Sequence, residues 1–233
     1  MRLRLAPALV SLAALAGCGS GTQTSAIPSG NGTTAVKATS TTTDSATTAP
    51  AGCTAAKKPQ PKPDGSYKRP ALELSGSRTY IATVKTNCGT FAMKLDVRHA
   101  PNAAASIYFL ASKKFFDGTV FHRIVPGFVI QGGDPTGSGT GGPGYATVDK
   151  PPRGASYSRG VVAMAKGGDE PAGTAGSQFF VVTGADAGLP PDYAILGKVV
   201  NGFDVVKRIG KLGDQSEQPT ATVEILSLRV RPS

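Results

Sequence analysis

Beyond its first twenty residues, the sequence has no apolar run of the roughly twenty residues that a membrane-spanning helix needs. The apolar run at the start, from Leu5 to Ala16, is also too short to span a bilayer, and it follows Arg2 and Arg4. A short positive head before a short apolar core is typical of a secretory signal peptide. We therefore expect residues 1–17 to be a signal peptide and the mature protein to be exported without spanning the membrane.

The sequence also has few acidic and few aromatic residues. It carries 25 Lys and Arg against 15 Asp and Glu, a formal net charge of +10, and aromatics make up 6%. Nucleic acid is not expected as a partner, because the basic residues are not interleaved with aromatics. The excess charge gathers in a stretch that holds Lys57, Lys58, Lys62, Lys68 and Arg69. This stretch either lies on anionic lipid or wall polymer, or is a solvated tether.

The apolar core ends in a processing signal. The run Leu15-Ala16-Gly17-Cys18 resembles the lipobox of bacterial lipoproteins. The resemblance implies that the sulfur of Cys18 receives a diacylglyceryl group and that the chain is cut before this residue. We expect a protein held by this lipid on the extracytoplasmic face of a bacterial cell membrane. The alternative is an ordinary secretory signal that happens to contain a cysteine.

The segment after the signal lacks apolar bulk. Residues 19–50 are rich in Thr, Ser, Gly and Ala, and residues 51–78 add lysines and prolines. Such a segment buries too little apolar surface to offset the entropy of ordering, and its prolines favour extended polyproline II. We predict that residues 18–78 form a disordered, lipid-anchored linker.

The chain has only three cysteines. With Cys18 lipidated, Cys53 and Cys88 are an even pair in an oxidising compartment. We expect a disulfide between them that clips the end of the linker to the first hairpin. The alternative is two separate thiols.

Residues 79–233 are enough for one domain with a core. Apolar alternation and short apolar runs predict strands at 80–86, 90–95, 120–125, 128–132, 161–165, 179–183, 194–200 and 222–230. Helices are predicted at 101–112, where Pro101 suits the first turn, and at 205–209. Many short strands, Gly-rich connections and only two helices indicate a mainly β fold, a closed antiparallel barrel.

Three motifs within this domain are distinctive. They are FHRIVPGFVIQGGD at 121–134, GSQFF at 176–180, and LGKV at 196–199 followed by GF at 202–203. Together they resemble the cyclophilins, and the resemblance runs from about Tyr80 to Val230. It implies an eight-stranded barrel capped by two helices, an active groove on its outside, and peptidyl-prolyl cis–trans isomerase activity without metal or cofactor.

The motif residues suit that chemistry. Rotation about an X–Pro amide faces a barrier of roughly 18–20 kcal/mol because resonance is lost, but no bond forms or breaks. A permanently charged donor near the amide nitrogen favours the twisted state selectively. Arg123 fits this role, Gln131 can hold the substrate's carbonyl or amide, and Phe128 belongs to the apolar proline pocket that the resemblance implies. The residues expected to bind the substrate around them are Val129, Lys166, Gly167, Gln178, Phe180, Leu189 and Tyr193.

Other motifs of known enzymes are incomplete. Residues 137–142 and 139–144 both satisfy G-x-G-x-x-G, but no strand-turn-helix unit surrounds either, so a dinucleotide site is not expected. Ser177 lacks the G-x-S-x-G elbow of hydrolases. His122 stands beside Arg123, but alternation on a strand points it away, so we expect a structural role.

The chain has no tryptophan, and Gly188, or Ala187 if the alignment shifts by one residue, stands where many cyclophilins carry one. In those cyclophilins the indole borders the groove and donates to the inhibitor cyclosporin, so we expect weaker binding of that inhibitor here. We expect a monomer that acts on proline-containing polypeptides of exported or cell-envelope proteins. The alternative is a non-catalytic holdase that grips proline-containing segments, which would need the pocket but not Arg123.

Overall fold

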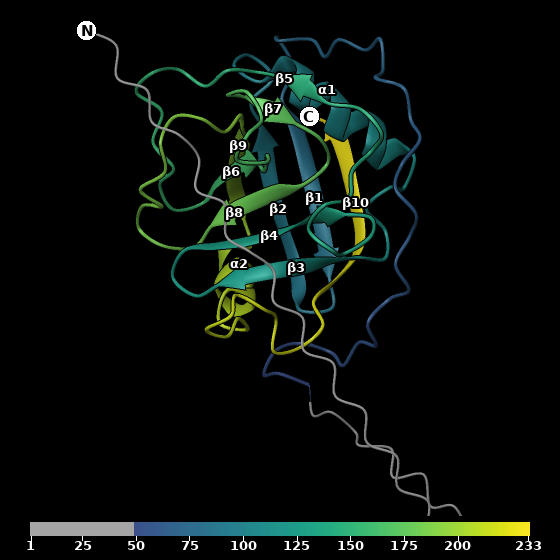
Figure 1. The fold of residues 1–233 in the computed structure, drawn as a ribbon, viewed down its shortest axis with the longest axis vertical. Helices are drawn as coiled ribbons and strands as arrows, with labels where there is room; N and C mark the ends of the chain where they lie inside the picture. The colour runs from purple at the N-terminus through teal and green to yellow at the C-terminus, as the bar shows by residue number, and fades with distance from the viewer. Residues whose placement is uncertain (1–48) are drawn as a thin grey trace, which may run out of the picture. The chain divides into compact units, whose positions relative to one another are not determined.

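The computed structural model describes residues 49–233, so the predicted signal peptide, Cys18 and the first part of the predicted linker lie outside the described residues. Eight strands form the main sheet: β1 (Tyr80–Thr86), β2 (Gly89–Leu95), β3 (Thr119–Val125), β4 (Val129–Asp134), β6 (Val161–Met164), β8 (Phe179–Val182), β9 (Ile195–Asn201) and β10 (Glu224–Pro232). They close into an antiparallel barrel in the order β1-β10-β3-β4-β8-β6-β9-β2 (Figure 1). The predicted barrel is confirmed.

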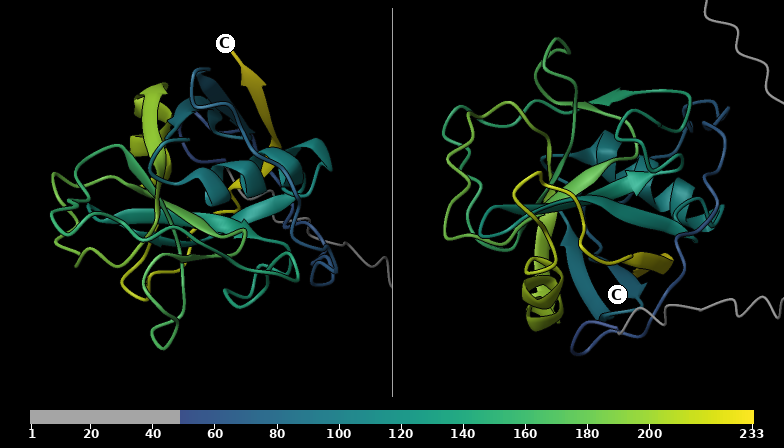
Figure 2. Two further views of the ribbon diagram at one scale, coloured as in Figure 1. Left: turned by 90° about the horizontal axis from the view of Figure 1, so that it is seen from above. Right: turned by 60° about the horizontal axis from the view of Figure 1, so that its bottom comes forward.

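Two helices lie at opposite ends of the barrel, as Figure 1 and Figure 2 show. Helix α1 (Pro101–Ser112) begins at a proline, and α2 (Phe203–Ile209) begins after Gly202. The N-terminus of α1 has no side-chain cap of its own. Instead, the carboxylate of Asp149 accepts the backbone N–H of Ala103 at 2.6 Å, which satisfies one of the free donors of the first turn.

A small second sheet pairs β5 (Thr147–Val148) with β7 (Thr174–Ala175). The sequence analysis missed it because a two-residue strand shows no period of apolar residues. The eight strands of the barrel and both helices lie close to their predicted ranges.

Apolar side chains form two clusters, one inside the barrel and one outside it. The inner cluster contains Phe91, Phe121 and Phe179, which are at most 1% exposed. All residues of β6 and β8 are buried, because their outer faces are covered as well as their inner faces. Short continuous apolar runs are typical of strands buried on both faces. The outer cluster consists of Val129, Tyr157, Val161, Ala163, Phe180 and Val182.

Residues 49–78 differ from the predicted disordered linker. They run over the surface of the barrel and are held by a disulfide between Cys53 and Cys88. The ring of Tyr67 packs edge-on against Phe109 and Phe115, at centroid distances of 5.8 and 6.0 Å. The prediction of disorder is therefore wrong for these residues. Their composition alone does not offset the entropy lost on ordering, but the cross-link and the aromatic packing do. We call residues 49–78 the strap.

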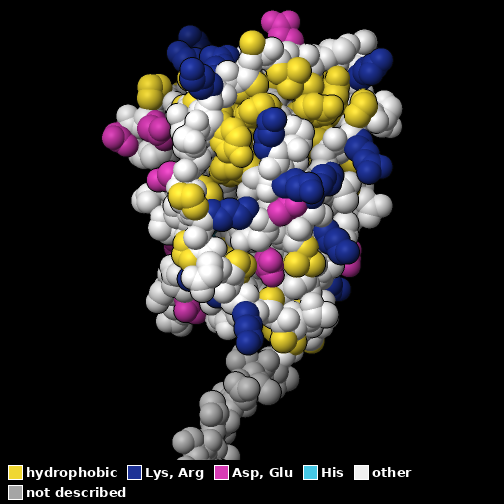
Figure 3. Space-filling view, turned by 90° about the vertical axis from the view of Figure 1, so that its right-hand side faces the viewer, with side chains coloured by type: hydrophobic (Ala, Val, Ile, Leu, Met, Phe, Trp, Pro, Cys, Tyr) yellow, Lys and Arg dark blue, Asp and Glu magenta, His cyan; other side chains and the backbone are white. Residues whose placement is uncertain are grey.

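In Figure 1 the strap runs along the right-hand side of the molecule, which is the side that faces the viewer in Figure 3. Lys and Arg side chains are spread over this face with a few acids between them, and apolar side chains gather toward the α1 end. Among residues 49–233, no helix has the length and apolar character to cross a membrane.

Strand β3 is bulged at His122, which has no partner on β4, whereas Phe121 pairs with Gly132 and Arg123 pairs with Gln131. Both ring nitrogens of His122 are buried without a hydrogen-bond partner. Burial lowers the pKa of His122 below 6.5, which the attraction of Asp134 only partly opposes. A bulge re-aims side chains, so strict alternation does not by itself describe this strand.

This burial predicts a loss of stability in mild acid. The folded pKa of His122 lies below the unfolded value, so the unfolded chain binds the proton first. The stabilisation is complete above about pH 6.5 and is lost as the pH falls toward the folded pKa, by up to about 1.4 kcal/mol per pH unit. We expect His122→Gln to remove this slope in urea unfolding measured between about pH 7 and pH 5. His99→Gln, at the exposed histidine, is the control, and an unchanged slope in His122→Gln would contradict the account.

Candidate active site

One row of cross-strand neighbours carries the central groups of the site. Arg123 on β3 lies opposite Gln131 on β4, which lies opposite Phe180 on β8. Directly opposed residues of antiparallel strands share a face, with Cβ atoms about 4.5–5.5 Å apart. The closed barrel therefore brings together, on its outer surface, two residues of the motif at 121–134 and one residue of the motif at 176–180.

A hollow of about 260 Å³ lies beside this row. Its base is apolar, because Val129 and Phe180 are only 1% and 4% exposed and belong to the outer cluster. The ring of Tyr193 stands edge-on to Phe180 at 5.6 Å. The Tyr157 hydroxyl fixes Tyr193 by accepting its N–H and donating to its carbonyl. The hollow is lined by Arg123, Phe128, Val129, Gln131, Ala165, Lys166, Phe180, Leu189 and Tyr193.

The guanidinium of Arg123 has three neighbours. Its Nε donates to Glu217 Oε2 at 2.6 Å, and its Nη1 donates to Gln131 Oε1 at 3.4 Å. Its carbon atom lies 6.0 Å from the centre of the Phe128 ring, in range of a cation–π contact. Since guanidinium has five N–H donors, donors on Nη1 and Nη2 remain for a ligand in the hollow.

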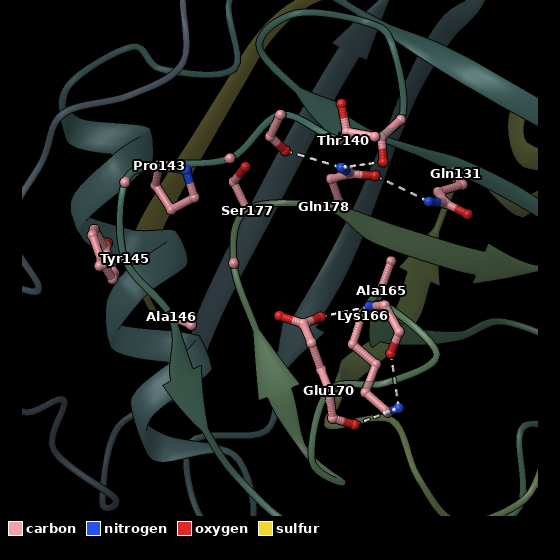
Figure 4. Close-up of a pocket in the computed structure, with 16 residues that line it drawn as sticks. Gln131, Thr140, Pro143, Tyr145, Ala146, Ala165, Lys166, Glu170, Ser177 and Gln178 are labelled. Atoms are coloured by element: carbon pink, nitrogen blue, oxygen red, sulfur yellow. Dashed lines mark hydrogen bonds between the residues drawn. The ribbon is translucent and has the colours of Figure 1, made fainter.

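Gln131 is oriented from both sides. Its oxygen accepts from Arg123, and its Nε2 donates to Gln178 Oε1 at 3.0 Å. Gln178 in turn donates through Nε2 to the carbonyls of Gly139 and Gly141, each at 2.9 Å. This chain of hydrogen bonds fixes which end of each amide faces its neighbour (Figure 4).

A second hollow, of about 440 Å³, adjoins the first and shares Gln131, Ala165 and Lys166 with it. Figure 4 shows Gln178 on one side of it and Lys166 with Glu170 on the other. The glycine-rich residues 139–144 form part of its wall. Two adjoining hollows on an open surface suit an extended peptide better than a small molecule.

Lys166 is held at the border of the two hollows. Its Nζ lies 2.8 Å from Asp192 Oδ2 and donates to the carbonyls of Gly167 and Glu170. It also lies 5.5 Å from the centre of the Tyr193 ring. The hydrogen bond to Asp192 raises the pKa of Lys166, so the ammonium stays charged and its charge is largely compensated.

Known proteins share this fold and these motifs. The sequence model of the family described as "Cyclophilin type peptidyl-prolyl cis-trans isomerase/CLD" matches residues 81–230. The chain belongs to the cyclophilin family. Peptidyl-prolyl cis-trans isomerase-like 1 of Neurospora crassa is 38% identical over 152 residues, covering 63% of this chain and 91% of that protein. Peptidyl-prolyl cis-trans isomerase A of Mycobacterium tuberculosis is 37% identical over 171 residues, covering 65% and 92%.

A solved cyclophilin agrees with these relatives. The crystal structure of a cyclophilin type peptidyl-prolyl cis-trans isomerase of Cryptosporidium parvum has a TM-score of 0.61 and 31% identity, and the match covers 66% of this chain and 98% of that one. A second structure of the same isomerase was determined in the presence of the dipeptide Ala-Pro, with a TM-score of 0.60. This cyclophilin is accordingly a peptidyl-prolyl cis–trans isomerase.

The structure places the site residues expected from the sequence in two neighbouring groups. Eight of them line the first hollow: Arg123, Gln131, Phe128, Val129, Lys166, Phe180, Leu189 and Tyr193. The other two, Gly167 and Gln178, line the second hollow. Gly188 has a positive φ of 61°, and a Cβ added there would meet no atom within 4 Å. A Cβ at position 188 would therefore have room, although the backbone conformation there favours glycine.

The sequence analysis missed Glu217. This residue lies 94 positions from Arg123 and belongs to none of the motifs. Its backbone has a positive φ of 64°, which is uncommon for a residue with a side chain. Its carbonyl accepts the N–H of Ile124, so the loop holds Glu217 beside β3 from both its backbone and its side chain.

Replacing Arg123 tests the charged donor. We expect Arg123→Ala to lower kcat/KM for a short X–Pro peptide by two orders of magnitude or more, on the order of the loss seen when a transition-state donor is removed. Arg123→Lys should recover little, because a point charge does not reproduce the fork of donors. NMR exchange rates of the peptide measure the activity of each variant, and circular dichroism checks that the variant is folded. A folded Ala variant with near-normal rates would contradict the role.

Replacing Glu217 tests whether Arg123 needs its partner. The ion pair is partly exposed, with side-chain exposures of 33% and 46%, so its contribution is about 0.2–1 kcal/mol. We therefore expect Glu217→Ala to lower kcat by at most about fivefold. Glu217→Gln should lose less, since its amide oxygen can still accept from Nε. A loss as large as that of Arg123→Ala would mean that Glu217 does more than orient the guanidinium.

Proposed function

We propose that the protein is a lipid-anchored isomerase on the outer face of a bacterial cell membrane, where it acts on X–Pro bonds of exported and cell-envelope proteins. The observation that carries this proposal is the lipobox-like run ending in Cys18, in the same chain as a cyclophilin domain. The disulfide between Cys53 and Cys88 supports it, because disulfides persist mainly in oxidising compartments. Residues 1–17 are then the signal peptide, and residues 18–48 connect the lipid to the strap.

The proposed catalysis is electrostatic. Uncatalysed exchange of an X–Pro bond takes tens of seconds or more, so turnover on the order of 10³ s⁻¹ requires about 7 kcal/mol of selective stabilisation. The proline ring occupies the apolar hollow over Phe180 and Val129. The free donors of Arg123 then face the proline nitrogen, which becomes more basic as the amide twists, so the attraction is stronger in the twisted state.

Gln131 positions the substrate in this scheme. Its amide is oriented by Arg123 and Gln178, so it presents a fixed pattern of donor and acceptor to the substrate backbone. Such pre-orientation lowers the entropy lost when the peptide binds. The residues that precede the proline lie in the second hollow, beside Lys166, Gly167 and Gln178. No proton is transferred and no covalent bond is formed.

The anchor is tested by Cys18→Ser in the bacterial cell. We expect the variant to move from the membrane fraction to the soluble fraction or the medium, because one modification supplies the acyl chains. Ser20→Ala, two residues further on, is the matched control and should remain with the membrane. Mass spectrometry of the membrane-bound form should find the acyl groups on Cys18 at the new N-terminus.

Two results would contradict the proposal. A Cys18→Ser variant that stays in the membrane fraction would show that another feature anchors the protein. A wild-type protein recovered in the cytoplasm with residues 1–17 still attached would show that the segment is no signal peptide. Isomerase activity of the purified domain is unaffected by either result, because it does not depend on the anchor.

A further inference from the structure

The strap is an addition to the part of the chain that matches known cyclophilins. The family match begins at residue 81, after the strap ends. Its first attachment is at the turn between β1 and β2, where Cys53 bonds to Cys88. Beside it, the N–H of Thr54 donates to the carbonyl of Asn87, and the side chain of Asn87 donates back to the carbonyl of Thr54, each at 2.8 Å.

The second attachment is to the glycine-rich residues 137–144, which we call the glycine loop. The N–H of Gly65 donates to the carbonyl of Gly142 at 2.9 Å, and the N–H of Tyr67 donates to that of Pro143 at 3.0 Å. The carboxylate of Asp64 accepts the N–H of Gly142 at 3.0 Å. Two backbone–backbone hydrogen bonds and one bond to the Asp64 side chain thus join the strap to the glycine loop.

Glycine is required where the two backbones meet. A Cβ on Gly65 would lie 2.7 Å from backbone atoms of Pro143, and a Cβ on Gly144 would lie 2.4 Å from the carbonyl oxygen of Gly65. Real Cβ atoms do not approach other atoms so closely, so a side chain at either position forces the strap and the loop apart. The contact is therefore built into the sequence at these two glycines.

A third attachment fixes the strap between the other two. The Nζ of Lys62 donates to the carbonyl of Phe115 at 2.9 Å and to that of Asp117. Burial lowers the pKa of this lysine, which the neighbouring carboxylate of Asp117 partly opposes. A partly buried ammonium with carbonyl acceptors is a specific contact, since it does not persist in a segment free in solvent.

The other side of the glycine loop faces the candidate active site. Gly139 and Gly141 accept the hydrogen bonds of Gln178, which is itself bonded to Gln131. The loop also forms a wall of the second hollow. On its inner side the buried carboxylate of Asp134 accepts the N–H groups of Gly139 and Gly141, so the loop is held there independently of the strap.

We propose that the strap is a specificity element for the isomerase. By holding the glycine loop from outside, it sets the shape of the second hollow and so decides which residues are accepted before the proline. The disulfide between Cys53 and Cys88 makes this selectivity depend on an oxidising environment. The proposal rests on the binding of those preceding residues in the second hollow, as argued above. The proline pocket itself has no contact with the strap among the interactions described.

The test compares two glycines of the strap. Gly65→Ala drives a Cβ into Pro143, whereas a Cβ at Gly76 meets no atom within 4 Å, so Gly76→Ala is the matched control. The substrates are two blocked peptides of equal length, Phe-Ala-Ala-Pro and Ala-Ala-Ala-Pro, and kcat/KM is measured for each by NMR exchange. We expect Gly65→Ala to change the ratio of the two values by about fivefold, the effect of losing roughly one hydrogen bond. Gly76→Ala should leave the ratio unchanged.

The role of the disulfide is tested with the same peptides. Treating the wild-type protein with dithiothreitol should change the ratio in the same direction as Gly65→Ala. The double variant Cys53→Ser, Cys88→Ser should show the changed ratio from the start and give no response to the reductant. Hydrogen exchange of residues 137–144 should be faster in the reduced protein and in Gly65→Ala.

Three outcomes would overturn the proposal. One is an unchanged ratio in both Gly65→Ala and the reduced protein. Another is an equal loss for both peptides in a folded variant, which would make the strap a support of the whole domain and not a specificity element. The third is unchanged exchange of the glycine loop. If the wild-type protein catalysed exchange of neither peptide, the proposed placement of the substrate would be contradicted instead. Failure of the specificity proposal and failure of the proposed function are therefore distinguishable.

Discussion

The register of β3, β4 and β8 determines where the groups of the candidate site lie. Arg123, Gln131 and Phe180 are neighbours only because each is directly opposite the next in the barrel. A slip of one residue in any of these pairings would turn the slipped strand's side chain to the other face of the sheet. Closure of the barrel prevents such a slip, since no strand has a free edge along which it could move. The proposed catalysis thus depends first on the backbone hydrogen bonds that pair these strands.

On this frame the site combines an apolar base with one charged group. Phe180 and Val129 belong to the outer cluster, so the floor of the hollow is apolar and packed from below. Arg123 stands at its rim, tied to Glu217 on one side and to Gln131 on the other. Glu217 occupies a left-handed backbone conformation, which costs of order 1–3 kcal/mol and persists only where surrounding contacts maintain it. The strained residue thus lies next to Arg123, the residue proposed to carry catalysis.

Some of this arrangement could be predicted from the sequence and some could not. The motifs at 121–134 and 176–180 contain five of the nine residues that line the first hollow. The buried runs of β6 and β8 could be recognised by their length and composition. Glu217 could not be found, because its contact with Arg123 exists only once the loop before β10 folds back on β3. The bulge at His122 was hidden for a similar reason: alternation in one strand does not show an unpaired residue.

The order of the strap is the feature that the sequence analysis predicted wrongly. Its composition of Lys, Pro and Gly is typical of solvated tethers, and composition reflects what a segment can bury on its own. It does not show that Gly65 is matched to Pro143 or that Tyr67 meets Phe109 and Phe115. The disulfide that holds the start of the segment was expected, but from the number of cysteines and not from the composition of the segment. A segment with little apolar surface can be ordered when the surface it crosses provides the partners.

The central claim, that catalysis rests on a permanently charged donor and oriented amides, is tested most directly by the pH dependence of kcat/KM. The rate of X–Pro exchange in a short peptide should be followed from about pH 5 to pH 9, where neither guanidinium nor amide groups titrate. The account predicts a constant value over the range in which the protein stays folded. A sigmoidal or bell-shaped profile in the folded protein, with an inflection that disappears in His122→Gln, would contradict it by showing that a proton-transferring group takes part.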